Sequence, residues 1–332
     1  MILILSQEGL EPTTDAVVDW IRSLGGDCVR VNGADIGGAV AMEMGVDRAG
    51  PLVRLRVGER EVTSREVRVV WLWRWQTRKG PRAQSLPGSE PLATDINAHL
   101  ASETNAVSRA FFSLFRHARW LTSPDETALS KIDALQAAVQ AGLEVPATLV
   151  TNRRAEIERF RTRHGRIITK SVGEAGTFGV GDRHYALYTA EATEPVTAQL
   201  PETIFPSLVQ ELVEKAFEVR AFYLDGQVYS MAIFSQADQQ TSLDLRQYND
   251  RKPSRMVPYR LPAPVAEAVV RLMSALGLSS GSLDLVRTPD GRHVFLEVNP
   301  AGQIGMVSTP CNYYLPRRVA EYLIAKDADV HA

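Results

Sequence analysis

The segment Phe295-Leu296-Glu297-Val298-Asn299-Pro300 decides the fold, together with Asp284 on the strand that precedes it. Apolar residues dominate both 282–287 and 293–298, and the sequence between them is typical of a tight turn. These two runs are therefore predicted to pair as a β-hairpin.

Oxygen-bearing side chains gather in this hairpin. Because side chains alternate along a strand, Glu297 and Asn299 share one face, and Asp284 can point to the same side. Their apolar neighbours bury the strands, and a buried carboxylate needs a partner. Two carboxylates and an amide oxygen suit Mg²⁺, so the sequence predicts that Asp284, Glu297 and Asn299 bind magnesium.

A lysine precedes a glycine-rich loop in the middle of the chain. Lys170 ends a predicted strand, and the loop after it contains Gly173, Gly176, Thr177 and Gly179. Such a loop lets backbone N–H groups approach phosphates while the ammonium group supplies positive charge. The spacing matches neither the P-loop nor the dinucleotide-binding fingerprint, so a flexible surface loop remains the alternative.

A third group follows a strand that ends at Glu211. The stretch Glu211-Leu212-Val213 can present backbone groups to a planar base, and Glu218 can accept hydrogen bonds from ribose hydroxyls. Arg220 follows on the next strand, and Lys131 lies on a predicted helix. Taken singly, each of these residues is more often plain surface.

Composition bounds the class of protein. The chain has 332 residues, a formal net charge of −2 and a pI near 6.3, which does not suggest nucleic-acid binding. It has two cysteines, Cys28 and Cys311, with no metal-site spacing, which fits a reducing cytoplasm. No apolar run approaches the length of a membrane span, and the opening residues predict a first strand, not a signal peptide.

A tryptophan-rich run, 67–75, is followed by arginines. Its alternation places Val67, Val69 and the tryptophans on one face of a predicted strand. Arg74 and Arg78 lie at its end, where they could bind an acidic partner or belong to a solvated loop.

The order of these features along the chain resembles the ATP-grasp superfamily. It runs from Lys131 through Lys170 and its loop, the Glu211 hinge, Glu218 and Arg220, then Asp244 and Arg246, to Asp284 and Glu297-x-Asn299. The resemblance implies an ATP-grasp fold of the α/β (α+β) class, in which nucleotide binds between two subdomains. The expected domains are an N-terminal α/β domain (1–120), a central subdomain with the glycine-rich loop (121–205) and a C-terminal subdomain with the metal site (206–332).

A closer resemblance joins three segments to the graspetide synthetases, and within them to the grasp-with-spasm type. These segments are Met1 to Gln7 with Thr13-Thr14-Asp15, Phe222 to Gln236, and Gly302 to Ser308 with Cys311 to Leu315. The family implies a ligase that binds the leader of a ribosomal precursor peptide and joins Asp or Glu side chains of its core to Thr, Ser or Lys. Relatives end the tryptophan strand in Trp-Tyr-Arg-Arg, whereas this chain has Trp73-Arg74-Trp75-Gln76-Thr77-Arg78. The chain thus departs from the family pattern where Arg74 and Arg78 are the candidates for substrate binding.

The resemblance also implies roles. ATP and Mg²⁺ are the expected cofactors, with Lys131 and Lys170 on the α- and β-phosphates, Gly176, Thr177 and Gly179 around them, and Glu211, Leu212, Val213 and Glu218 on the nucleoside. Arg220 and Arg246 are candidates for the γ-phosphate and the acyl phosphate, and Asp244 is one possible base. A homodimer is expected from the superfamily alone.

Two alternatives remain at this point. One is an ATP-grasp ligase that adds a free amino acid to a protein or small peptide, since the ATP site would be the same. The other is a non-catalytic ATP-binding module.

Overall fold

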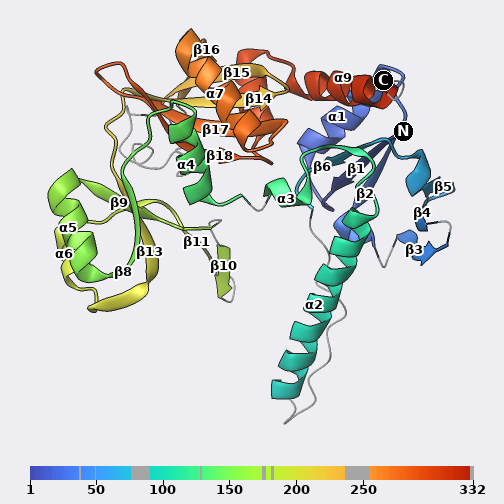
Figure 1. Cartoon of the computed structure of the whole chain (residues 1–332), viewed down its shortest axis with the longest axis horizontal. Helices are drawn as coiled ribbons and strands as arrows, with labels where there is room; N and C mark the ends of the chain where they lie inside the picture. Colours follow the sequence, from blue (N-terminus) through green and yellow to red (C-terminus); the bar gives the residue numbers. More distant parts are fainter. Residues whose placement is uncertain are drawn as a thin grey trace. The chain divides into compact units, whose positions relative to one another are not determined.

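The computed structural model shows two compact units (Figure 1). The first comprises residues 1–127, 303–308 and 314–332, and the second comprises 128–302 and 309–313. The three-part division predicted from the sequence differs from this one and stays a prediction. The structure describes residues 1–36, 39–48, 50–75, 90–127, 129–173, 177–180, 183–235 and 254–329.

A parallel sheet forms the centre of the first unit. Its strand order is β2-β1-β6-β7, and every pair of neighbours is parallel. The strands are β1 (Ile2–Ser6), β2 (Cys28–Asn32), β6 (Val69–Leu72) and β7 (Arg119–Leu121). The chain therefore places β2 on one side of β1 and β6 on the other.

The tryptophan strand differs from its prediction. It is only four residues long, and Val69, Val70, Trp71 and Leu72 are all buried. Both faces of this strand are therefore buried, as is usual for a central parallel strand.

Helices cover one face of this sheet and a second sheet covers the other. Helices α1 (Pro12–Ser23) and α9 (Leu315–Ala328) pack on each other and on the parallel strands. On the opposite face, Leu3 and Leu5 of β1 share a core with Leu55 of a three-stranded antiparallel sheet and with Phe111. This layer contains β3 (Val40–Asp47), β4 (Gly50–Val57), β5 (Arg60–Thr63), the short helices η1 (Gly33–Asp35) and η2 (Ser64–Glu66), and the end of α2 (Glu90–Ser113).

A five-stranded antiparallel sheet dominates the second unit. Its order is β16-β15-β14-β17-β18. The strands are β14 (Phe217–Leu224), β15 (Gln227–Phe234), β16 (Arg255–Tyr259), β17 (Ser280–Arg287) and β18 (His293–Asn299). The predicted hairpin of β14 and β15 is confirmed, and positive φ angles at Asp225 and Gly226 match its Asp-Gly turn. One face packs on α4 (Lys131–Gln140) and α7 (Ala263–Ala275), and the predicted metal ligands lie on the other.

A smaller four-stranded sheet, ordered β12-β9-β13-β8, completes the second unit. Helices α5 (Arg154–His164) and α6 (Glu194–Ala198) cover one face, where Ile157 and Val209 form a small core. The strands are β8 (Thr148–Arg153), β9 (Ile167–Lys170), β12 (Ala190–Glu191) and β13 (Thr203–Glu211), with the hairpin β10 (Thr177–Val180) and β11 (Arg183–Ala186) nearby in sequence. The remaining helices are α3 (Pro124–Thr127) and α8 (Ile304–Cys311).

Within the described ranges, every helix is too short or too polar to cross a membrane.

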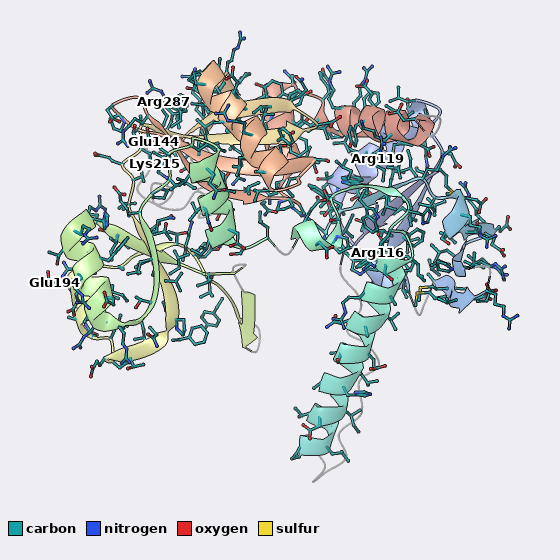
Figure 2. The ribbon with its side chains drawn as sticks, in the orientation of Figure 1. Arg116, Arg119, Glu144, Glu194, Lys215 and Arg287 are labelled. Carbon is teal, nitrogen blue, oxygen red and sulfur yellow. The ribbon has the colours of Figure 1, made fainter. Side chains whose placement is uncertain are left out.

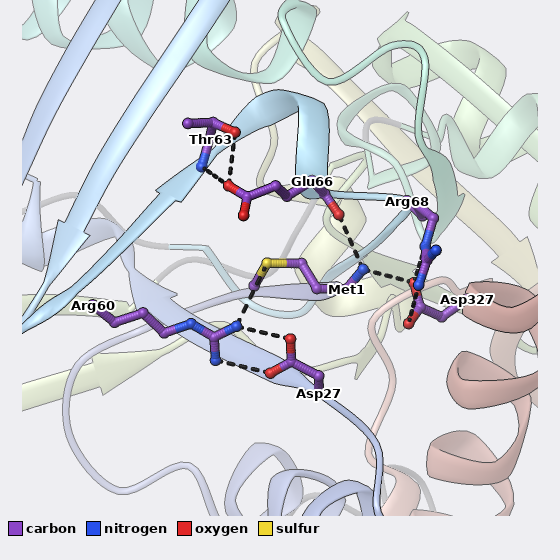
Figure 3. Close-up of polar contacts among 7 residues, drawn as sticks. All are labelled: Met1, Asp27, Arg60, Thr63, Glu66, Arg68 and Asp327. Carbon is purple, nitrogen blue, oxygen red and sulfur yellow. Dashed lines mark hydrogen bonds and ion pairs between the residues drawn. The ribbon is translucent and has the colours of Figure 1, made fainter.

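An ion-pair network fastens α9 to the start of the first unit (Figure 3). The α-amino group of Met1 lies 2.9 Å from Asp327 Oδ1 and donates to the carbonyl of Glu66 at 3.0 Å. Arg68 Nε also donates to Asp327 Oδ1, at 2.8 Å. Burial raises the pKa of the Asp327 carboxyl, but hydrogen bonds and charges from Arg68 and the Met1 amine outweigh it and hold the pKa below its ordinary value.

We expect Asp327→Asn to lower the free energy of unfolding by about 1–3 kcal/mol, because the buried Met1 amine loses its counter-charge. Because the folded pKa lies below the ordinary one, this stabilisation is present above about pH 4 and is lost as the pH falls through the folded value. Urea unfolding from pH 7 to 3 measures it. The matched control is Asp329→Asn, because Asp329 is half exposed and its ion pair with Arg119 is long, at 3.9 Å. Equal effects of both variants would contradict the role of Asp327.

Candidate active site

A row of charged side chains crosses the face of the five-stranded sheet that the helices leave open. Arg220 on β14 lies opposite Asp284 on β17, and Asp284 lies opposite Glu297 on β18. Ser282 and Asn299 form the next opposed pair. The structure therefore brings the three predicted metal ligands together, with Arg220 beside them.

A β-bulge at Leu296 makes this arrangement possible. Leu285 pairs with Phe295, whereas its neighbour Asp284 pairs with Glu297, so Leu296 is an extra residue in β18. Without the bulge, alternation would place Phe295 and Glu297 on the same face. With it, Phe295 is fully buried in the core under the helices and Glu297 points to the opposite face.

Each carboxylate has a cationic neighbour. Both oxygens of Asp284 accept from Arg220, with Nε–Oδ1 at 2.6 Å and Nη2–Oδ2 at 2.7 Å. Lys170 Nζ lies 4.0 Å from Glu297 Oε2, and only 12% of the Lys170 side chain is exposed. The smaller sheet, which carries Lys170, thus meets the larger one at this charge row.

The donor set fits magnesium. Asp284 and Glu297 supply two carboxylates, Asn299 an amide oxygen, and Ser282 a buried hydroxyl that has no hydrogen-bond partner among the described residues. In the described part of the chain there is no group of three or more His, Cys, Asp and Glu side chains that could hold a metal. Oxygen donors with two negative charges suit Mg²⁺ that keeps some of its waters, and do not suit zinc.

Lys131 begins α4, where the hydroxyl of Ser130 caps the helix. Its Nζ donates to the carbonyls of Ser171 at 2.9 Å and Gly173 at 2.8 Å. These carbonyls follow Lys170 directly, so both predicted phosphate-binding lysines converge where the glycine-rich loop begins.

The predicted hinge leaves β13 at Glu211. Glu211 and Leu212 donate backbone hydrogen bonds to the carbonyls of Ala147 and Arg166, both at 2.9 Å. Glu211 Oε2 accepts from the Ala147 N–H at 3.2 Å. Among the described residues no hydrogen bond involves Val213, so its backbone groups can meet a base edge.

Glu218 is held at the start of β14. Its carboxylate pairs with Lys215, labelled in Figure 2, and accepts from the Ser235 hydroxyl at 2.8 Å. These contacts fix the carboxylate on the same sheet face as Arg220, two residues along the strand.

Several predicted site residues stay untested by geometry. Gly176, Arg78, Asp244 and Arg246 lie outside the described residues. Thr177 and Gly179 lie on β10, where only the backbone is described. Arg74 belongs to the first unit, immediately after β6.

Solved structures similar to this chain include two ligases in complex with peptides. The macrocyclase MdnC of Microcystis aeruginosa, bound to precursor peptide MdnA, has a TM-score of 0.81 at 22% identity and covers 98% of this chain and 99% of its own. An ATP-grasp ligase of Chryseobacterium gregarium, in complex with ADP and a leader and core peptide, has a TM-score of 0.86 at 21% identity, covering 98% and 96%. D-cycloserine synthetase DcsG has a TM-score of 0.52 at 14% identity, covering 97% and 99%.

The chain has the ATP-grasp fold. The predicted fold class is thereby confirmed over nearly the whole chain. No protein-family model matches the sequence, and no curated protein matches it either. Two features of this candidate site were not predicted from the sequence: the bulge at Leu296 and the buried hydroxyl of Ser282. The one sign of the bulge in the sequence is that apolar Phe295 and acidic Glu297 are two residues apart, a spacing that would give them the same face in a regular strand.

A cavity of about 450 Å³ lies elsewhere in the second unit of this ATP-grasp chain, lined by β15, α7 and the residues before α7. Two of its lining tyrosines are hydrogen-bonded within the protein: Tyr313 donates to the Ser230 carbonyl at 2.8 Å, and the Tyr259 hydroxyl lies 2.9 Å from His293 Nε2. The cavity contains none of the predicted ATP-site residues.

We expect Arg220→Gln to strengthen the binding of free Mn²⁺, a spectroscopic substitute for Mg²⁺, by about three- to tenfold, because Asp284 loses a competing cation. Electron paramagnetic resonance without nucleotide measures the affinity. The matched control is Arg166→Gln, which breaks an equally bidentate pair with Glu191 on the other sheet. Unchanged or weaker Mn²⁺ binding in Arg220→Gln would show that Arg220 does not compete with the metal for Asp284.

Proposed function

We propose that this protein is an ATP-dependent carboxylate ligase that acts on a ribosomally made precursor peptide. It would activate Asp or Glu side chains as acyl phosphates and condense them with Thr, Ser or Lys side chains into macrocyclic esters or amides. The observation that carries the proposal is the charge row of Arg220, Asp284, Glu297 and Lys170 on an ATP-grasp fold.

Activation is the step that needs ATP, because an unactivated carboxylate has no adequate leaving group. A carboxylate oxygen of the peptide attacks the γ-phosphorus, the bond to the β-phosphate oxygen breaks, and ADP leaves. Phosphoryl transfer asks the protein mainly for positioning and for positive charge. Lys131 and Lys170 supply this charge at the start of the glycine-rich loop.

Magnesium held by Asp284, Glu297 and Asn299 would neutralise phosphate charge when bound. Arg220 is well placed for a second task. Its planar fork now grips Asp284, and the same geometry matches the oxygens of a γ-phosphate or an acyl phosphate. We include Arg246 and Asp244 in this proposal as a second phosphate ligand and a candidate base.

Condensation follows within the same site. The hydroxyl or amine of the acceptor side chain attacks the acyl carbon, phosphate leaves, and the acceptor loses one proton to a base. Each ring therefore removes one water from the peptide. The hinge residues Glu211, Leu212 and Val213, with Glu218, are proposed to hold the nucleoside throughout.

A peptide substrate is favoured over a small molecule by the comparisons. Ligases solved with precursor or leader peptides match with TM-scores of 0.81 and 0.86, against 0.52 for D-cycloserine synthetase. A ligase for free amino acids remains the second candidate, because the same ATP site would serve it. A leader-bearing precursor is the proposed partner, and a homodimer in the cytoplasm stays a prediction.

We expect Lys170→Ala and Glu297→Ala to abolish condensation while leaving the unfolding temperature nearly unchanged, because both side chains lie at the charge row and not in the core. The substrate to use is an acidic, threonine-rich peptide encoded beside this gene. Mass spectrometry after incubation with ATP and Mg²⁺ should show a loss of about 18 Da per ring with the wild type alone.

Lys326→Ala and Glu321→Ala, both on α9, are the matched controls and should retain full product. Normal turnover by Lys170→Ala would refute the site assignment. A mass gain with free amino acids, in place of a mass loss, would favour the small-substrate ligase.

A further inference from the structure

The parallel sheet of the first unit has a natural ligand position. Strand β1 lies between β2, which follows it in sequence, and β6, which comes later, so the strand order reverses between β1 and β6. In open α/β sheets, ligands bind outside the carboxyl ends of the strands at this reversal. Two loops lie there, residues 7–11 after β1 and 73–75 after β6.

A buried carboxylate joins these two loops. Glu11 is 1% exposed, and its Oε1 accepts from the indole Nε1 of Trp73 at 3.3 Å. Its Oε2 accepts from Gln7 Nε2 at 3.2 Å and from Arg74 Nη1 at 3.4 Å. Burying a charge is costly unless it is paired, so Glu11 and its three donors hold each other in place.

Arg74 is the exposed member of the group. Its backbone is left-handed, with φ of 58°, a conformation that side chains other than glycine rarely adopt and that clusters at functional sites. The guanidinium carbon lies 5.9 Å from the centre of the Trp73 ring, and 35% of the side chain is exposed. In the described ranges its other N–H groups meet no acceptor, so one edge of the fork is available to a ligand.

The neighbouring residues limit the kind of ligand. Leu10 is 90% exposed beside Glu11, which offers an apolar contact. Glu8 and Glu11 lie on the same short loop, so a polyphosphate with several negative charges would be repelled there. A single carboxylate next to an apolar side chain fits both features, because an arginine fork matches carboxylate geometry.

We propose that this edge binds a carboxylate of the peptide substrate, with Arg74 as the binding group and Glu11 as its positioning residue. The inference rests on the proposed function, since it names the part of the chain that holds one acidic side chain of that peptide. Glu11 and Trp73 fix the guanidinium before the peptide arrives, which lowers the entropic cost of binding.

The test uses the full chain without ATP. Two synthetic threonine-rich decapeptides differ only at one position, Glu in one and Gln in the other, and are titrated against ¹⁵N-labelled protein. The Trp73 indole N–H, identified with Trp73→Phe, is the reporter because it donates to Glu11. We expect this signal to move with the Glu peptide, and the Gln peptide to bind about tenfold more weakly, the loss of one charge-assisted contact.

Arg74→Gln should abolish this preference for the Glu peptide. Glu11→Gln should reduce it severalfold while the Trp73 signal shifts in the free protein. The matched control is Arg317→Gln, because Arg317 also lies over a tryptophan, Trp20 at 5.3 Å, and pairs with a glutamate, Glu321 at 2.8 Å. Arg317→Gln should keep the full preference.

Two results would overturn the proposal. One is equal binding of the two peptides, or no response of the Trp73 indole to either. The other is an unchanged preference in Arg74→Gln, whose side chain is exposed enough that the variant should fold. The wild-type condensation assay runs in parallel. If the wild type forms product and Arg74→Gln does not change the preference for the Glu peptide, this inference alone is refuted. If the wild type forms no product, the proposed function is refuted, and the titration still decides whether Arg74 binds a carboxylate.

Discussion

The bidentate pair between Arg220 and Asp284 is the interaction on which the rest of the site depends. It joins neighbouring strands of the five-stranded sheet on the face that the helices leave open, and it fixes a carboxylate that would otherwise face its neighbour Glu297 uncompensated. Lys170 does the same for Glu297 from the smaller sheet. An opposite charge beside each carboxylate offsets part of the repulsion between them. The two carboxylates are therefore paired with cations of the protein itself, and in the function proposed above nucleotide and metal would rearrange these pairs on binding.

The first unit contributes differently. Its sheet is covered on both faces, and the two carboxylate clusters described above lie at the ends of its strands. At the amino ends, Asp327 ties the last helix to Met1 and Arg68. At the carboxyl ends, Glu11 ties two loops together through Trp73 and Arg74. In both places a largely buried carboxylate accepts hydrogen bonds from several donors. Asp327 stabilises the fold at the amino ends, and Glu11 positions Arg74 at the carboxyl ends.

The sequence predicted much of this, and the failures have identifiable causes. The hairpin of β17 and β18, and the grouping of Asp284, Glu297 and Asn299 on it, could be predicted because alternation and turn residues are local signals. The strand in the tryptophan run is shorter than predicted, and a single sequence does not show that a second sheet, β3 to β5, covers one of its faces. The left-handed backbone at Arg74 could not be foreseen, since nothing in the residue type favours it. The sequence gives no sign of the role of Glu11, because its partner Trp73 lies 62 residues away along the chain.

The extra residue at Leu296 has a consequence for how this gene can vary. Side-chain direction on a strand depends on whether the count of residues is odd or even, and the bulge sets that parity between Phe295 and Glu297. Deleting the Leu296 codon would make Phe295 and Glu297 neighbours, which a regular strand points to opposite faces, so the ring would stay in the core and the acid outside it as the bulge disappeared. Homologous genes are therefore expected to carry these two codons either at this spacing with a bulge or one codon closer without one.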